Sequence, residues 1–203
     1  MSVDPATIVY DGHGNATQVG SQSWSYDGAD RVTGTSTSGI APSQTVSYVR
    51  DVLGRVASRS ASGVEASTVR YGFTGTGDSP DLLLTAGGAV VERYVSLPGG
   101  VLHRKGYAVG ATGSWSVSNL HGDVIATVSG GVVTAGCVYD PFGQPLNPAS
   151  GVVDTTAVPA TRAGTGTTDG WAGVFQRGYE HTGGLSQTLM GARTYLPALG
   201  MFT

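Results

Sequence analysis

The sequence predicts an all-β protein made of antiparallel hairpins, with negligible helix. Glycine occurs 33 times and proline 9 times among 203 residues, so nearly every window of about twelve residues contains a helix breaker. Hydrophobic residues make up 39% of the chain, which is enough to build a core and too many for a disordered segment. The alternation around Val46 and Tyr48 has the period of two that strands with one buried face show. We therefore expect a curled or spiralling sheet of hairpins, a partial β-shell.

The first part of this sheet is a hairpin pattern that recurs in residues 8–17, 24–33 and 46–56. Each copy has an aromatic residue, an aspartate, a turn with Gly or Asp, and an outgoing strand. The copies contain Tyr10 and Asp11, then Tyr26, Asp27 and Arg31, then Tyr48, Asp51 and Arg55. Aspartate accepts hydrogen bonds from turn amides, and glycine adopts the positive φ of a reversal. The tyrosine spacings of 16, 22 and 23 residues are unequal, which favours a spiral over a strict solenoid.

The hairpins are expected to continue as far as residue 144. Segments typical of strands occupy residues 81–85, 88–96, 97–102 and 115–126, and Gly130-Gly131 is a two-residue hairpin signal. Tyr139, Asp140 and Gly143 belong to a last and stricter copy of the aromatic-aspartate pattern. We assign residues 1–144 to the repeat sheet and residues 145–170, which are rich in Pro, Thr, Gly and Ala, to a loop or linker.

Residues 171–203 form the third predicted part, the C-terminal segment. It has an aromatic-rich start, a turn at Gly183-Gly184, an extended apolar run and a second turn before the end. Its marked residues are Glu180, His181, Arg193, Tyr195, Pro197 and Gly200. We expect Arg193 to make a charge-assisted contact with Glu180 and His181 across the hairpin. We interpret this contact as an ordering interaction rather than a catalytic one.

The charge balance limits the partners. Ten Arg and one Lys against eleven Asp and three Glu give a net charge of −3, so there is no basic footprint for nucleic acid or an anionic membrane. No apolar run approaches the length of a membrane span, and residues 1–7 lack the regions of a signal peptide. Cys137 is the single cysteine, which rules out an internal disulfide and a cysteine zinc site; we expect it to be a small buried side chain.

Candidate catalytic and metal-binding patterns are weak, so we expect no enzyme, cofactor or metal. The four histidines show no ligand spacing, no serine lies in a Gly-x-Ser-x-Gly turn, and the Gly-Thr-Gly stretches lack the rest of a phosphate loop. His121 with Asp123 is the nearest approach to a catalytic pair. Its place in a turn favours a structural hydrogen bond, but an enzyme within the β-scaffold stays open as an alternative.

The ordered motifs resemble those of the Rhs or YD-repeat family along essentially the whole chain. The Tyr-Asp copies resemble YD repeats, while residues 119–123 and 139–143 resemble the transition to the Rhs-associated core segment, and residues 171–203 resemble that segment itself. The resemblance implies a hollow spiral β-shell like those of Rhs toxins, toxin-complex C components and teneurins. In such relatives the core segment plugs or caps one end, and a toxin is held inside.

The chain departs from that family in ways that bear on chemistry. Met201 stands where relatives usually have Arg, and Leu196 where they have Asp. The sequence also ends at Thr203, before the family's Asp-Pro motif, its self-cleaving aspartates and the toxin. Cleavage of the aspartyl type needs two carboxylates that share a proton, and no matching positions occur. The resemblance therefore implies a non-enzymatic scaffold or encapsulation fragment of a secreted polymorphic toxin.

The same resemblance sets expectations for partners and location. Partners would be other parts of an Rhs shell or a toxin cargo, and open sheet edges favour self-association. The chain would act secreted or at the cell surface through a larger export system, or in the cytoplasm if it is a separate remnant. The alternative function is a surface adhesion or carbohydrate-binding module, because aromatic side chains recur on the strands and could stack on sugars; packing between neighbouring hairpins is the simpler interpretation.

Overall fold

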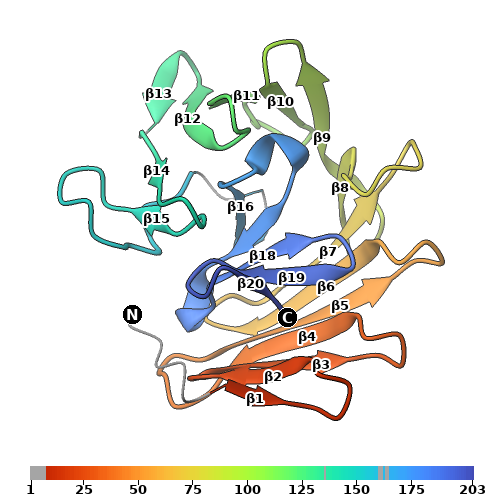
Figure 1. Cartoon of the computed structure of the whole chain (residues 1–203). Coiled ribbons are helices and arrows are strands. Elements are labelled where there is room, and N and C mark those ends of the chain that lie inside the picture. The colour runs from red at the N-terminus through yellow and green to blue at the C-terminus, as the bar shows by residue number, and fades with distance from the viewer. Residues whose placement is uncertain (1–7, 135, 160–161, 163–164) are drawn as a thin grey trace.

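The computed structural model describes residues 8–134, 136–159, 162 and 165–203, and their fold is all-β (Figure 1). Antiparallel strands form three sheets, and none of the sheets closes into a barrel. The only helical elements of the described residues are two single 3-10 turns, η2 (Gly173–Phe175) and η3 (Thr182–Gly184). The predicted fold class, a curled antiparallel sheet with negligible helix, is confirmed.

The largest sheet has thirteen strands that pair in sequence order, each with its neighbours in the chain. Its strands are β1 (Ile8–Tyr10), β2 (Ala16–Val19), β3 (Gln22–Tyr26), β4 (Val32–Thr37), β5 (Gln44–Arg50), β6 (Val56–Gly63), β7 (Ser67–Gly72), β8 (Leu82–Thr85), β9 (Val90–Leu97), β10 (Val101–Gly106), β11 (Ser114–Ser118), β12 (Val124–Ser129) and β13 (Val132–Thr134). Such a meander follows from short hairpin connections, which place consecutive strands side by side. Gly130 and Gly131 turn the last hairpin, both with positive φ, as the sequence predicts.

Two smaller sheets complete the fold. One pairs β14 (Val138–Tyr139) with β15 (Pro145–Leu146), and the other, the C-terminal sheet, contains β16 (Thr167–Asp169), β17 (Gly178–Glu180), β18 (Gln187–Met190), β19 (Arg193–Leu196) and β20 (Met201–Phe202) in that order. Strand β16 lies in the stretch assigned to a loop or linker, and all three of its residues are buried. The end of that stretch is therefore an integral strand of the C-terminal sheet.

The long sheet curls around the C-terminal sheet, which lies inside the curl (Figure 1). Leu185 and Leu196 from the C-terminal segment pack with Val19, Trp24 and Val46 of the long sheet in one buried cluster. A second cluster, further along the curl, contains Val69, Tyr71, Leu83, Tyr94 and Leu102. The C-terminal segment thus supplies part of the core, and it contacts the face of the sheet rather than only one end of it.

The recurring aromatic side chains of the long sheet differ in burial. Trp24, Tyr48, Tyr71 and Tyr94 are buried on the inner face, where they pack as the sequence predicts. Tyr10, Tyr107 and Trp115 are instead 51%, 48% and 43% exposed. The four buried aromatic side chains are therefore not available for stacking on sugars.

Candidate functional site

The Asp27 turn shows how the Tyr-Asp repeat closes a hairpin. The Asp27 carboxylate accepts bonds from the backbone amides of Ala29 (2.9 Å) and Arg31 (3.1 Å), and from Nε of Arg31 at 2.8 Å. The Asp27 amide in turn donates to the carbonyl of Arg31 at 3.0 Å. The side-chain bond from Arg31 is the main reason why the pKa of Asp27 falls to about 2. One carboxylate thus satisfies the donors of a five-residue turn.

The same turn recurs at each predicted repeat, so its residues have structural roles. In each copy the turn begins with an aspartate, and the side chain four residues later donates a hydrogen bond to its carboxylate. The pairs are Asp11–Asn15 (3.0 Å), Asp51–Arg55 (2.7 Å) and Asp140–Gln144 (2.8 Å). In residues 119–123 the order is reversed: the amide residue Asn119 is at the first position and donates a hydrogen bond at 2.9 Å to the carboxylate of Asp123 at the fifth.

The second carboxylate oxygen of Asp123, Oδ1, makes further contacts. It contacts Nδ1 of His121 at 2.7 Å and accepts a hydrogen bond from the backbone amide of Ala172 at 2.9 Å. Although burial opposes ionisation, these bonds hold the pKa of Asp123 below its ordinary value. The His121–Asp123 pair therefore ties the start of the C-terminal segment to the β11–β12 turn, in agreement with the structural interpretation.

The fourth residue of each turn adopts positive φ. This residue is glycine in four copies, Gly14, Gly54, Gly122 and Gly143, with φ between 81° and 97°. Asp30 takes the position in the Asp27 turn with φ of 57°, a conformation that non-glycine residues seldom adopt. Its carboxylate accepts bonds from Asn15 at 2.9 Å and contacts His13 at 2.8 Å, so it links two neighbouring turns.

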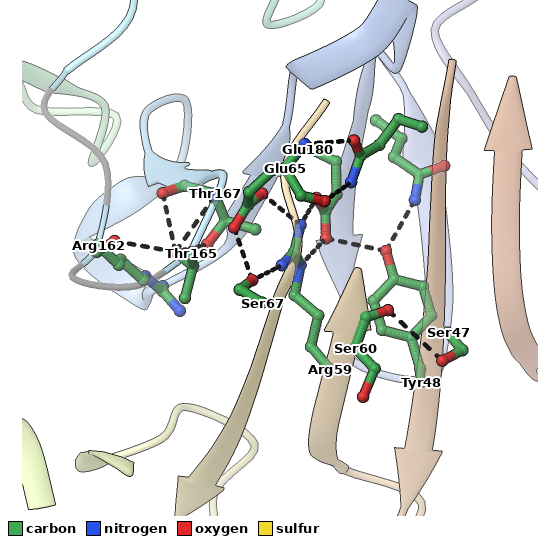
Figure 2. A network of polar contacts seen from close by, with 12 residues as sticks. Ser47, Tyr48, Arg59, Ser60, Glu65, Ser67, Arg162, Thr165, Thr167 and Glu180 are labelled. Atoms are coloured by element: carbon green, nitrogen blue, oxygen red, sulfur yellow. Dashed lines mark hydrogen bonds and ion pairs between the residues drawn. The ribbon is translucent and has the colours of Figure 1, made fainter. Parts of the chain in front are cut away.

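A fully buried ion pair joins the C-terminal sheet to the long sheet (Figure 2). Arg59 on β6 donates from Nε and Nη2 to the two carboxylate oxygens of Glu180 on β17, at 2.7 and 2.8 Å. Both side chains are 0% exposed. Tyr48 on β5 donates its hydroxyl to the same carboxylate at 3.0 Å, and Glu65 contacts Arg59 at 3.3 Å. We call Tyr48, Arg59, Glu65 and Glu180 the anchor.

Burial and charge oppose each other within the anchor. Burial alone would lower the pKa of Arg59, but the adjacent Glu180 carboxylate raises it overall. Burial raises the pKa of Tyr48 well above its usual value, and the charge of Glu180 adds to this effect. Arg59 and Tyr48 therefore stay protonated and act as donors, and the carboxylate of Glu180 is consumed as their acceptor.

A chain of buried amides extends the anchor toward β3. Gln187 on β18 donates to the hydroxyl of Tyr48 at 3.1 Å and accepts bonds from Trp24 and Gln22, both at 2.6 Å. Gln22 accepts the backbone amide of Ser186 at 3.2 Å. These bonds join residues that are 139 to 165 positions apart, so they lock the C-terminal segment to the first hairpins.

The structure corrects the predicted role of Arg193. Arg193 is exposed and pairs in register with Met190 on β18, whereas Glu180 pairs with Gln187 and takes its charge partner from Arg59, 121 residues away. The prediction assumed that the partner would come from the same hairpin. Neither the spacing nor the composition of the sequence points to Arg59, because nothing in an alternating strand marks an arginine as inward-facing.

The other marked residues of the C-terminal segment are structural as well. The His181 ring stacks on Tyr179 with centroids 5.9 Å apart, and burial lowers its pKa. The Tyr195 ring stacks on Trp171 with centroids 5.0 Å apart and contacts the tilted ring of Phe202 at 5.3 Å.

The turn that begins at Pro197 ends at Gly200. The Gly200 amide donates to the carbonyls of Leu196 at 2.9 Å and of Pro197 at 3.4 Å. Gly200 has φ of 64°, and a Cβ there would lie 3.0 Å from the ring of Phe142. The last copy of the Tyr-Asp turn, which contains Phe142, thus packs against the end of the chain.

Sequence reasoning missed a second buried ion pair. Arg162, in the predicted linker, donates from Nε to Asp169 on β16 at 3.0 Å and from Nη2 to the carbonyl of Gln176 at 2.9 Å. Both members of the pair are 3% exposed. Two further contacts attach the C-terminal segment to the long sheet and its loops: Arg177 pairs with Asp78 at 2.7 Å in an exposed contact, and Arg50 donates to the carbonyl of Gly191 at 2.9 Å in a partly buried one.

The described residues contain no group of three or more His, Cys, Asp or Glu side chains that could hold a metal ion. Cys137 is buried, and burial raises the pKa of its thiol, which lowers its reactivity. None of the described helices is long and apolar enough to cross a membrane.

A cleft of about 610 Å³ lies between the first hairpins, the loop around residues 153–155 and the C-terminal segment. Trp24, Leu185 and Leu196 contribute apolar walls. Among its polar lining groups, Gln22 and Gln144 already have hydrogen-bond partners. The cleft therefore presents mainly apolar surface, and these two polar side chains are already engaged within the fold.

Known proteins resemble this chain in fold, but none shows which family it belongs to. No protein-family model matches the chain, and no curated protein matches it. A Tc holotoxin pore of Photorhabdus luminescens, with a mutation in TccC3, matches with a TM-score of 0.55 and 15% identity over 95% of this chain.

Two crystal structures give similar values. TcdB2-TccC3-TEV matches with a TM-score of 0.60 and 17% identity over 98% of this chain, and TcdB2-TccC3-Cdc42 with 0.63 and 16% over 95%. The chain spans only 9% to 10% of the length of these three proteins. Its fold is therefore similar to that of one part of a toxin-complex chain.

Proposed function

We propose that the chain is a non-enzymatic structural unit of an Rhs-type β-shell, within a secreted toxin assembly. In this proposal the long sheet is part of the shell wall, and the C-terminal segment is fixed to its inner face. The observation that carries the proposal is the buried anchor, in which Glu180 of the segment is held by Arg59 and Tyr48 of the wall. The fold likeness to toxin-complex chains supports it.

The use of polar groups also supports a structural role. Asp27 and Asp51 are each bonded to an arginine four residues later, and Glu180 and Asp169 are each buried against an arginine. A catalytic acid or base needs a free position and a substrate within hydrogen-bond reach. These carboxylates are instead consumed in turns and in contacts between the sheets.

A segment exchange tests the proposal. The part of a TcdB2–TccC3 shell that this chain matches would be replaced by residues 8–203, and the protease resistance of a protein enclosed in the chimeric shell would be measured. We expect a folded chimera that protects its cargo. The same chimera with Glu180→Ala is the matched control, and it should lose protection because Arg59 is left buried without its partner. A folded chimera that leaves cargo open to protease would overturn the encapsulation role.

The non-enzymatic part has a separate test. His121→Ala, Asp123→Asn and Asp140→Asn variants would be compared with the unmodified chain in a panel of hydrolase and protease assays. We expect no activity in any of the four proteins. Activity that is present in the unmodified chain and lost in a folded variant would contradict the proposal.

A further inference from the structure

The outer face of the long sheet changes character along the strand order. Across β4 to β7 the outward residues in register are Gly34, Ser47, Ser60 and Thr68. Across β9 to β13 the corresponding row is Val95, His103, Trp115, Val128 and Val133. The first row suits a face in contact with water, whereas the second places apolar side chains side by side on the outside.

This second row, which we call the apolar row, is solvent-accessible. Val95, Trp115 and Val133 are 38%, 43% and 66% exposed, and the Trp115 ring contacts the tilted ring of His103 with centroids 4.2 Å apart. Val132 precedes Val133 on β13, so its side chain points to the opposite face, and it is 62% exposed. Contiguous exposed apolar patches of this kind mark interaction sites in soluble proteins.

The apolar row ends at an open sheet edge. The strand order of the long sheet stops at β13, and among the described residues no strand pairs with its outer side. Proteins usually protect such an edge with Lys, Glu, Pro or a covering segment. Residues 129–138 contain no charged residue and no proline. The β13 edge is thus both unpaired and unprotected.

The positions of the charges decide how a partner would approach. Arg93 and Lys105 lie opposite each other on β9 and β10, and both are exposed. Packing two apolar rows face to face would bring the cations of both copies together. Pairing two β13 edges would separate the two copies of Arg93 by nine strand spacings, roughly 43 Å, and the two copies of Lys105 by seven, roughly 34 Å. Both distances are several times the Debye length of about 8 Å.

We propose that β13 pairs antiparallel with β13 of a second copy of this chain. The two copies then form one continuous sheet with the apolar row extended across a two-fold axis. Main-chain hydrogen bonds give the contact its direction, as in other strand-addition complexes, and Val132 and Val133 are covered by the same residues of the partner. A two-fold contact uses one surface twice and closes, so it forms a dimer and not a fibre.

Sedimentation velocity across a concentration series tests the proposal. The full chain should show a reversible monomer–dimer equilibrium. Val133→Lys should weaken the dimer about tenfold for each copy, and so about a hundredfold in total, because each copy loses one buried valine contact. Val49→Lys is the matched control, since Val49 is 63% exposed on the outer face of β5, an interior strand, and it should leave the dimer unchanged.

The remaining outcomes contradict the proposal. A chain that stays monomeric throughout the series would overturn it. So would a dimer that is lost in Trp115→Lys and kept in Val133→Lys, because that result assigns the contact to the face instead of the edge. A monomer that sediments only with phosphatidylglycerol-containing vesicles would assign the apolar row and its two cations to a lipid surface. Circular dichroism of each variant separates these outcomes from misfolding.

Discussion

Replacing Glu180 by Gln tests the anchor most directly. The substitution keeps the size of the side chain and removes its charge, so that Arg59, at 0% exposure, is left with Glu65 at 3.3 Å as its one anionic contact. Removing one member of a buried ion pair destabilises a protein by about 3–5 kcal/mol, because the remaining charge stays desolvated. We expect a loss of that size, toward its lower end because Glu65 stays in place.

Equilibrium unfolding in urea, followed by tryptophan fluorescence, measures this loss. Trp24 reports on the anchor, since its indole nitrogen donates to Gln187, which bonds to Tyr48. Asp78→Asn is the matched control, because it breaks an ion pair with Arg177 whose aspartate is 44% exposed. Exposed pairs contribute about 0–1 kcal/mol.

A double variant separates charge from packing. Arg59→Met together with Glu180→Gln removes both charges, and it should recover much of the stability that Glu180→Gln loses. Two results would refute the reasoning. One is a loss of stability in Glu180→Gln that is no larger than the loss in Asp78→Asn. The other is a double variant that is no more stable than Glu180→Gln.

The remaining predictions concern a glycine contact and a buried histidine. Gly143→Ala should destabilise the fold by more than Gly14→Ala, although both residues have φ near 90°. A Cβ at Gly143 would lie 2.6 Å from the Trp171 ring, while a Cβ at Gly14 would have nothing within 4 Å. Thermal unfolding of the two variants measures the difference, and equal losses of stability would contradict the contact with Trp171. Burial lowers the pKa of His181 in the folded chain, so the unfolded state binds more protons below about pH 6.5 and stability falls as the pH decreases, by up to about 1.4 kcal/mol per unit. His181→Phe should remove this dependence and His13→Gln should retain it, as measured by urea unfolding between neutral and mildly acidic pH; an unchanged pH slope in His181→Phe would contradict the assignment.

The locally determined features could be predicted from the sequence. Asp27 and Arg31 lie four residues apart, so the turn that they close depends on little beyond its own five residues. The same holds for the hairpin at Gly130-Gly131, where positive φ is a property of the residue type. Because the long sheet pairs its strands in chain order, these local signals were enough to give the fold class.

The anchor could not be predicted, because its contacts join distant parts of the chain. Arg193, which lies on β19 two strands after Glu180 on β17, was the predicted partner, yet the curl of the sheet brings Arg59 to the carboxylate instead. An arginine in a strand is usually solvated, and Arg59 is buried only because Glu180 and Glu65 neutralise it inside the curl.

The sequence by itself determined the fold class, the Tyr-Asp turns and the hairpins of the long sheet, since each depends on residues within a few positions of one another. It did not show β16, which lies in the stretch assigned to a linker. Only the tertiary structure decided which face of each strand is covered and by what. The C-terminal sheet buries Arg59 on the inner face, whereas Val133 on the outer face of β13, the last strand of the long sheet among the described residues, is 66% exposed. Burial depends on the packing of segments far apart in the chain, and an alternating pattern marks two faces without saying which neighbour each will meet.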